Sequence, residues 1–193
     1  AQKRDVAHYL SGETVEQAAA VAQAPRCSAQ KDATPSSGGA ALLGWGFDDR
    51  NTRLIPAAVA GLSAAQIPKL KLKWALNYHG AIRARSQPTF ARGMLFVGSQ
   101  NGTVYALDAA SGCVRWTYRA TAEVRTPVVL SDSQSTAAGG TALAFFGDIL
   151  GRVYALDAGT GALKWKQRMD DHPSATITGA PVYHAGRLYV PVS

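Results

Sequence analysis

The feature that most constrains the fold of this chain is a long internal repeat. Residues 102–116 read Gly-Thr-Val-Tyr-Ala-Leu-Asp-Ala-Ala-Ser-Gly-Cys-Val-Arg-Trp, and residues 151–165 read Gly-Arg-Val-Tyr-Ala-Leu-Asp-Ala-Gly-Thr-Gly-Ala-Leu-Lys-Trp. In both copies a strand-like alternating run precedes an Asp, a Gly and a Trp at the same spacing. Two unrelated hairpins would not keep register over this length, so we interpret the copies as one structural unit used repeatedly.

The spacing within each copy has a physical interpretation. The Asp can accept backbone N–H bonds as the chain turns, and the Gly can supply the left-handed conformation that closes a short hairpin loop. The Trp then stands at a fixed point of the next strand, where it can pack against the neighbouring repeat and bury about 150–250 Å². These positions are Asp108, Gly112 and Trp116 in the first copy and Asp157, Gly161 and Trp165 in the second.

Each copy is preceded by further strand patterns separated by turn residues. We expect strands at 88–91, 94–99, 103–108 and 113–119, a second unit from 126–130 and 142–146 into the second copy, and a third beginning at 180–184 and 187–190. Four antiparallel strands in each unit of about forty to fifty residues are the blade pattern of β-propellers. The predicted fold is therefore all-β, a partial β-propeller with a short N-terminal helical segment.

The composition changes along the chain and indicates three regions. Residues 1–22 have a helical pattern, residues 23–41 collect Pro, Ser and Gly as a solvated linker does, and residues 42–193 carry the propeller repeats. Within the last region, Lys69–Trp74 alternates Lys and Leu before an aromatic residue, which predicts a strand that completes the final blade of a ring.

Composition also restricts the partners. Apolar residues make up 47% of the 193 residues, which is enough for a packed core. The net charge of +7 comes from scattered basic residues without a nucleic-acid-binding signature, so we expect no nucleic-acid partner. No apolar run is long enough to span a membrane, and the N-terminal residues lack the apolar stretch of an export signal.

The two cysteines leave two interpretations open. Cys27 and Cys113 have neither the spacing of a zinc site nor that of covalent haem attachment. In an exported protein they could form a disulfide that stabilises the fold by about 4 kcal/mol on the chain-entropy model. Two free buried thiols are the alternative.

The two copies also resemble a known motif. Ala106–Trp116 and Ala155–Trp165 resemble the tryptophan-docking motif of PQQ-dependent dehydrogenases, Ala-x-Asp-x-x-Thr-Gly-x-x-x-Trp, and the first copy departs from it only by Ser111 in place of Thr. This resemblance implies a quinoprotein alcohol dehydrogenase that uses PQQ and Ca²⁺ to oxidise secondary, including polymeric, alcohols. It also implies a periplasmic or secreted protein that passes electrons to cytochrome c.

Further segments extend the resemblance. Gly44–Arg53 together with Leu70–Trp74 looks like the start of the propeller in these enzymes. Asp170–Pro173 and Arg187–Ser193 are similar to the polyvinyl-alcohol dehydrogenase branch. Residues 2–12 look like the last helix of a c-type cytochrome domain, so any haem c would be bound by residues upstream of this chain.

The resemblance implies three candidate cofactor-binding residues. Arg125 matches an arginine that contacts the quinone, Thr178 matches a threonine near it, and Arg85 stands at the analogous place of the first blade. Relatives outside the branch often have a glutamate where Arg85 stands, which makes Arg85 the weaker candidate. The alternative for Arg125 is a solvated cation at a strand end, and for Thr178 an ordinary strand surface.

No catalytic residue or metal ligand is assigned within the chain. His172 lies beside Asp170 and Asp171, but we interpret these residues as a polar loop between blades because no further ligand has suitable spacing. The family's catalytic carboxylate and metal ligands would lie beyond Ser193, so we expect this piece alone to be inactive. The competing hypothesis is a non-enzymatic propeller scaffold similar to outer-membrane assembly lipoproteins, because a fold does not decide function.

Overall fold

The structure, a computed structural model, describes residues 25–28, 41–42, 44–46, 52, 54–78, 80–131 and 142–193. The helical segment predicted for residues 1–22 lies outside the described residues, as do residues 29–40 of the predicted linker.

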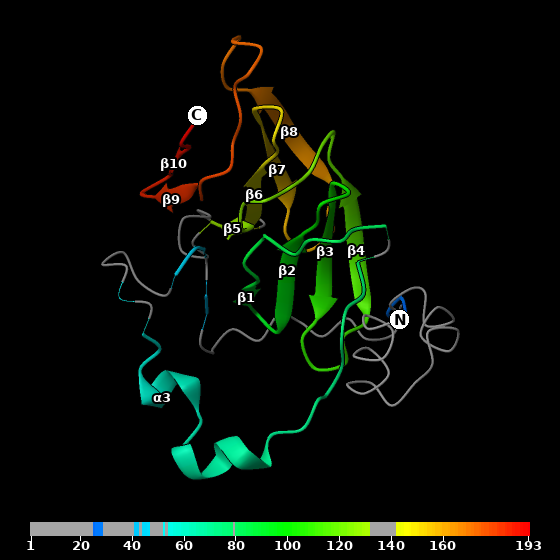
Figure 1. Cartoon of the computed structure of the whole chain (residues 1–193), viewed down its shortest axis with the longest axis vertical. Helices are drawn as coiled ribbons and strands as arrows, with labels where there is room; N and C mark the ends of the chain where they lie inside the picture. Colours follow the sequence, from blue (N-terminus) through cyan, green and yellow to red (C-terminus); the bar gives the residue numbers. More distant parts are fainter. Residues whose placement is uncertain are drawn as a thin grey trace, which may run out of the picture.

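Two four-stranded antiparallel sheets dominate the fold (Figure 1). Each sheet is a meander in which consecutive strands pair, in the orders β1-β2-β3-β4 and β5-β6-β7-β8. The first contains β1 (Thr89–Ala91), β2 (Met94–Gly98), β3 (Thr103–Asp108) and β4 (Val114–Arg119). The second contains β5 (Val129–Leu130), β6 (Leu143–Gly147), β7 (Arg152–Asp157) and β8 (Leu163–Arg168). The prediction of antiparallel four-stranded blades is confirmed.

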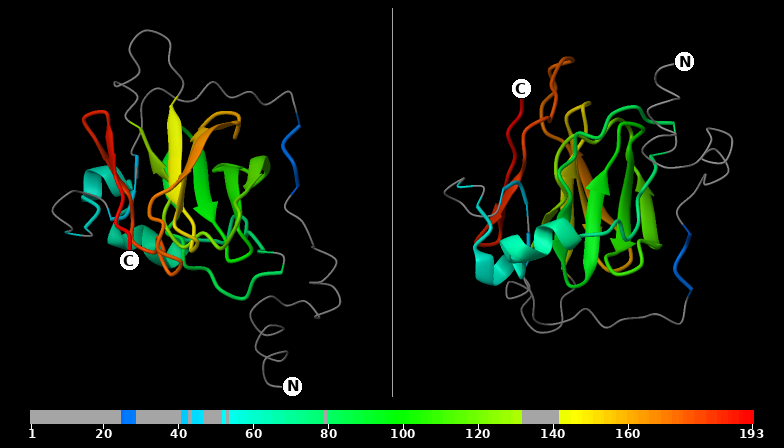
Figure 2. Two further views of the ribbon diagram at one scale, coloured as in Figure 1. Left: turned by 90° about the horizontal axis from the view of Figure 1, so that it is seen from above. Right: turned by 60° about the horizontal axis from the view of Figure 1, so that its bottom comes forward.

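A third unit begins with a hairpin of β9 (Val182–His184) and β10 (Arg187–Tyr189). Figures 1 and 2 show this hairpin to one side of the two sheets, where β9 contacts β5. The first strands of the three units, β1, β5 and β9, follow one another on one side of the molecule, while β4 and β8 lie on the other (Figure 1). This radial order of inner and outer strands is that of a propeller.

The core lies between the two blades. The alternation of β2, β3 and β4 turns one face of the first sheet toward the second, and both faces in contact are apolar. Their fully or almost fully buried side chains include Phe96, Val104, Ala106 and Trp116 from the first blade and Ala144, Phe146, Tyr154 and Leu156 from the second.

The indole of Trp116 fixes the first blade to the turn of the second. A Cβ atom added to Gly161 would lie 2.7 Å from the indole ring, so only a glycine leaves room for the aromatic side chain. The indole N–H donates a 3.0 Å hydrogen bond to the carbonyl oxygen of Ala158 in the same turn. Gly161 has a φ of 74°, which a side chain rarely adopts. The predicted packing of a tryptophan against the next repeat is confirmed.

Trp74 repeats this contact one blade earlier. Its indole N–H donates a 3.1 Å bond to the carbonyl of Ala109, and its ring lies 2.6 Å from a Cβ atom built on Gly112. The strand predicted over 69–74 is absent, however: Ala64–Lys69 is a 3₁₀ helix, and no strand is assigned between residues 70 and 78. Alternation alone does not make a strand when its backbone has no partner strand to bond.

Two helical turns within the predicted propeller region were not expected from the sequence. The α3 helix covers Ala57–Ala60, and the 3₁₀ helix η1 covers Ala64–Lys69. A capping box at the start of η1 joins the side chains of Ser63 and Gln66 to the backbone. The spacing of Ser63 and Gln66 is a local helix-start signal that can be read from the sequence.

Trp165 occupies the repeat position of Trp116 in the second blade. Its ring packs 6.0 Å from Phe145, as Trp116 packs 5.9 Å from Phe96 at the equivalent place. The indole of Trp165 remains 40% exposed, against 6% for Trp116. All six residues of β8 are exposed.

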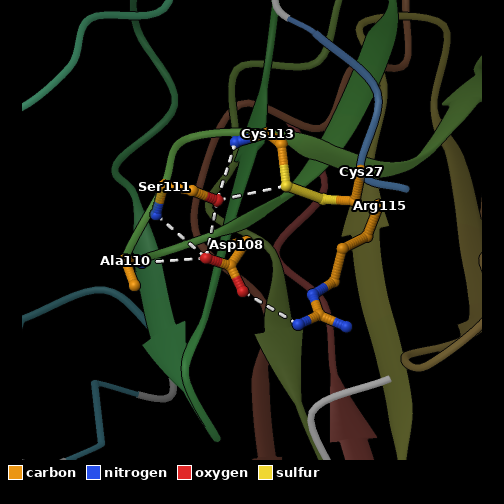
Figure 3. The surroundings of a disulfide bond; sticks show 6 residues. All are labelled: Cys27, Asp108, Ala110, Ser111, Cys113 and Arg115. Carbon is orange, nitrogen blue, oxygen red and sulfur yellow. Dashed lines mark hydrogen bonds and ion pairs between the residues drawn. A yellow bond between two sulfur atoms is a disulfide. The ribbon is translucent and has the colours of Figure 1, made fainter. Parts of the chain in front are cut away.

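Asp108 organises the turn that receives Trp74 (Figure 3). Its Oδ1 accepts bonds from the backbone N–H groups of Ala110 at 3.2 Å and Ser111 at 2.9 Å, and its Oδ2 pairs with Arg115 at 2.8 Å. The hydrogen bonds from Arg115 and from the Ser111 hydroxyl lower the pKa of Asp108 to about 2. Asp157 accepts the equivalent bonds in the second blade, from Gly159 and Thr160 at 3.0 Å each.

A disulfide joins Cys27 to Cys113 across a sequence separation of 86 residues (Figure 3). The backbone around it adds a parallel bridge to the outer edge of β4: Cys27 N–H donates to the carbonyl of Val114 at 3.0 Å, and Val114 N–H donates to that of Pro25 at 2.8 Å. The interpretation of these cysteines as two free thiols is wrong. The bond fixes residues 25–28 to the first blade and covers part of an exposed sheet edge.

We predict that Gly161→Ala destabilises the protein more than Gly93→Ala does. Both glycines have positive φ, 74° and 73°, but a side chain at Gly93 would meet nothing within 4 Å. Backbone strain is common to both, and overpacking against the Trp116 ring adds about 1–3 kcal/mol at Gly161. Urea unfolding monitored by tryptophan fluorescence measures the difference. Equal losses of stability in the two variants would show that the ring does not press on this turn.

The stabilisation from Asp108 should depend on pH in the acid range. Because its folded-state pKa is lowered from 3.8 to about 2, the stabilisation is complete above pH 4 and is lost as the pH falls toward 2. We predict that Asp108→Asn lowers the free energy of unfolding by about 1 kcal/mol at pH 7, after allowance for solvent screening, and by less near pH 2. Denaturant midpoints measured from pH 7 to pH 2 test this, and a gap that stays constant with pH contradicts it.

Candidate functional site

A hydroxyl group anchors the start of each of the first two blades. Ser86 Oγ accepts the N–H of Gly98 at 2.9 Å and donates to the carbonyl of Thr126 at 2.8 Å. Thr126 Oγ1 accepts the N–H of Gly147 at 3.1 Å in the same way. Both residues are buried, and they hold equivalent positions because each hydroxyl accepts the N–H of the glycine that ends the second strand of its blade.

Val124 and Ile177 are buried aliphatic residues at matching positions of the second and third repeats, because each packs against the glycine that ends the second strand of the preceding blade. Val124 covers Gly98 so closely that a Cβ atom there would lie 2.5 Å from it, and Ile177 covers Gly147 likewise. Val124 is 1% exposed and Ile177 is fully buried. The residue after each, Arg125 or Thr178, follows directly from a rigid anchor.

These anchors place the three sequence-predicted site residues at one position of three successive repeats. Arg85 precedes Ser86, Arg125 lies between Val124 and Thr126, and Thr178 follows Ile177, each shortly before an inner strand. Each of the three residues therefore lies shortly before the first strand of its unit, and these strands, β1, β5 and β9, follow one another on one side of the molecule, here called the inner edge (Figure 1). The structure thus relates all three residues, one from each blade.

Arg125 is held by an ion pair that sequence reasoning missed. Its Nη2 lies 3.0 Å from Oε2 of Glu123, and the side chains of Arg125 and Glu123 are 28% and 9% exposed. The hydrogen bond to Glu123 raises the pKa of Arg125 further. The spacing of the pair was the available signal, because residues two apart in an extended segment lie on the same side.

Two polar atoms of this pair lack a hydrogen-bond partner among the described residues. They are the buried Nε of Arg125 and the buried Oε1 of Glu123. By contrast, Arg85 and Thr178 are exposed. A series of two guanidinium groups and a hydroxyl offers donors suited to a ligand with several carboxylate groups.

The polar loop around His172 is held by local bonds. Asp170 Oδ1 accepts the N–H of His172 at 2.7 Å, and His172 Nδ1 accepts the N–H of Ser174 at 3.2 Å. These contacts shape a loop, as the sequence indicated. Among the described residues, no group of three or more His, Cys, Asp or Glu side chains is arranged to hold a metal ion. Within the same ranges, no helix is long and apolar enough to cross a membrane.

Comparison of the sequence with protein families gives a match along almost the whole chain. A family model described as "Outer membrane protein assembly factor BamB" (PQQ_2) matches residues 11–192. The chain belongs to this family of PQQ-repeat propellers. In this chain, the docking contacts of Trp74 and Trp116 join one repeat to the next.

Two relatives of this PQQ-repeat chain have a named enzymatic activity. It is 39% identical over 150 residues to a polyvinylalcohol dehydrogenase from Pseudomonas sp, a match that covers 78% of this chain and 23% of the relative. It is 41% identical over 172 residues to a polyvinylalcohol dehydrogenase from Sphingopyxis sp. strain 113P3, covering 88% of this chain and 25% of the relative. The resemblance to this branch is confirmed, and the chain spans about a quarter of the length of these relatives.

Solved structures show the same fold. A europium-containing methanol dehydrogenase is similar with a TM-score of 0.62 and 25% identity, over 81% of this chain and 28% of that one. A quinohemoprotein alcohol dehydrogenase from Comamonas testosteroni is similar with a TM-score of 0.64 and 24% identity, over 80% of this chain and 23% of that one. The PQQ-repeat chain therefore has the blade architecture of these propellers.

Proposed function

We propose that this chain is part of a PQQ-dependent alcohol dehydrogenase of the polyvinyl-alcohol type and contributes side chains to its PQQ site. The enzyme would oxidise secondary alcohols, including polymeric ones, and pass the electrons to cytochrome c. The observation that carries the proposal is the identity of 39% and 41% to two polyvinylalcohol dehydrogenases. The fold alone would not carry it, because scaffold proteins share the PQQ-repeat fold.

The candidate site supports the proposal chemically. PQQ carries three carboxylate groups, and when bound it supplies the group that accepts the hydride from the alcohol. The guanidinium of Arg125 can donate two parallel hydrogen bonds to one carboxylate, and the exposed Arg85 and Thr178 can donate to others. The donors present thus fit the cofactor. The proposal assigns the Ca²⁺ ligands, the catalytic carboxylate and any haem c to other parts of the enzyme.

The two arginines should contribute differently to binding. The charge of Arg125 is offset by Glu123 at 3.0 Å, so Arg125 contributes to ligand binding mainly through the direction of its hydrogen bonds. Arg85 is exposed and forms no ion pair within the described residues, so its full charge is available to an anionic ligand. In this proposal Arg85 attracts the carboxylates and Arg125 orients one of them.

A non-enzymatic scaffold remains the second candidate because the matching family model is described as an outer-membrane assembly factor. Such a protein would need only the stacked blades and their edges for its role. The two functions differ in one measurable property, which is specific binding of PQQ.

The decisive experiment reconstitutes the complete enzyme that contains this chain with PQQ and Ca²⁺. We predict dye reduction with a secondary alcohol, and a Kd for PQQ that rises about 10- to 100-fold in Arg125→Ala. That range corresponds to loss of a charged hydrogen-bonding partner. Titration calorimetry measures the Kd, and dye bleaching measures the activity.

Arg119→Ala is the matched control for this experiment. Arg119 lies on the outer strand β4, where it donates to Thr103 Oγ1 at 3.1 Å, so its removal should leave the Kd for PQQ unchanged. If the wild-type protein binds no PQQ, the scaffold function is favoured. If Arg125→Ala binds PQQ as tightly as the wild type does, Arg125 is not part of the site.

The disulfide supports a periplasmic or secreted location, because such bonds persist in oxidising compartments. We predict that neither Cys27 nor Cys113 reacts with a thiol reagent in the protein recovered from its native compartment unless reductant is added. Reduction should lower the free energy of unfolding by about 4 kcal/mol on the chain-entropy model. Two freely reactive thiols in native protein from the cytoplasmic fraction would contradict this location.

A further inference from the structure

The segment that carries the Glu123–Arg125 pair is held by contacts to both blades. The carbonyl of Glu123 accepts the N–H of Ile149 at 3.0 Å, which joins this segment to the second blade. The side chain of Val124 is pressed against Gly98 of the first blade. Thr126 bonds to Gly147 through its hydroxyl. These contacts fix the position of the backbone from which the Glu123 side chain extends to Arg125.

The bonding of Glu123 is unusual when it is compared with that of Asp108. Asp108 also pairs with an arginine, and its Oδ1 in addition accepts two backbone N–H groups and the Ser111 hydroxyl, which shape the docking turn. Within the described residues, the Glu123 carboxylate accepts a hydrogen bond from Arg125 through Oε2, and its Oε1 is buried without a partner. A buried carboxylate oxygen left unpaired lowers stability. Glu123 therefore does little for the turn or the blade and acts on Arg125.

We propose that Glu123 is a positioning residue for PQQ: it holds the Arg125 guanidinium in one orientation, with its exposed edge toward the inner edge of the blades. This inference rests on the proposed function. A free arginine at a strand end samples many rotamers and loses that freedom when it binds a ligand. The 3.0 Å bond to Glu123 removes most of this freedom before the cofactor arrives. The carboxylate itself does not contact the cofactor.

The sign of the effect separates this role from simple electrostatics. If Glu123 acted on PQQ only through its charge, its removal would leave Arg125 as an uncompensated cation and tighten the binding of an anionic ligand. If Glu123 orients Arg125, its removal weakens binding although the site becomes more positive. The two effects oppose each other, so the direction of the change in Kd identifies the dominant one.

The test measures the Kd for PQQ by calorimetry in the complete apo-enzyme, with Glu123→Ala and Glu123→Gln as variants. We predict that the Kd rises about tenfold in Glu123→Ala. In Glu123→Gln, which keeps an acceptor oxygen at the same place and the shape of the side chain, the Kd should rise about threefold. The glutamine variant keeps the test valid if the alanine variant does not fold.

Asp108→Ala is the matched control. It removes an ion pair of similar length from the outer turn of the first blade, and the Nε of its partner Arg115 is also buried without a hydrogen bond among the described residues. We predict that this variant loses thermal stability but keeps its Kd for PQQ within twofold of the wild type. An increase equal to that of Glu123→Ala would show that the effect is general destabilisation, which overturns the inference.

A double-mutant cycle completes the experiment. If Glu123 acts through Arg125, then adding Glu123→Gln to Arg125→Ala raises the Kd no further. An additional increase, or an unchanged or lower Kd in both single Glu123 variants, overturns the positioning role while wild-type binding of PQQ leaves the proposed function intact. A wild-type protein that binds no PQQ removes the proposed function itself.

Discussion

The structure depends on one recurrent contact, an indole ring laid over a left-handed glycine turn of the following blade. Trp74 on Gly112 and Trp116 on Gly161 show the same geometry, including the bond from the indole N–H to a carbonyl in the turn. A ring at this distance tolerates no Cβ atom, and a φ near 75° disfavours one independently. Two separate physical constraints therefore select glycine at this position, and together they fix how neighbouring sheets stack.

This stacking at the outer edge also fixes the relative positions of the inner strands. Blades locked by their outer turns hold β1, β5 and β9 in a constant relation, and there the Ser86 hydroxyl bonds to the Thr126 carbonyl of the next blade while the Thr126 hydroxyl bonds within its own blade. Whatever residue precedes or follows these anchors is presented at the same place in each blade. A repeat that is conservative at its anchors can thus vary the exposed side chain, here from arginine to threonine, without altering the scaffold.

The sequence predicted the parts of the fold whose chemistry is local. Asp108 and Gly112 shape their turn through bonds within a few residues, so their spacing was sufficient. The strand predicted over Lys69–Trp74 is absent because a strand needs a partner strand to bond, and the alternation of residues does not show whether one is present. The pairing of Cys27 with Cys113 required knowledge of which segments meet in space. The pairing of Glu123 with Arg125 could be inferred from their spacing, but the burial of Glu123 could not.

If the inner edge of these blades holds PQQ through Arg125, a crystal structure of the complete protein grown with PQQ should show the contact. We predict a PQQ carboxylate oxygen within about 3 Å of the Arg125 guanidinium, with Glu123 still bonded to that guanidinium on its other side. A structure with PQQ bound elsewhere, or with Arg125 turned away from the inner edge, would contradict it.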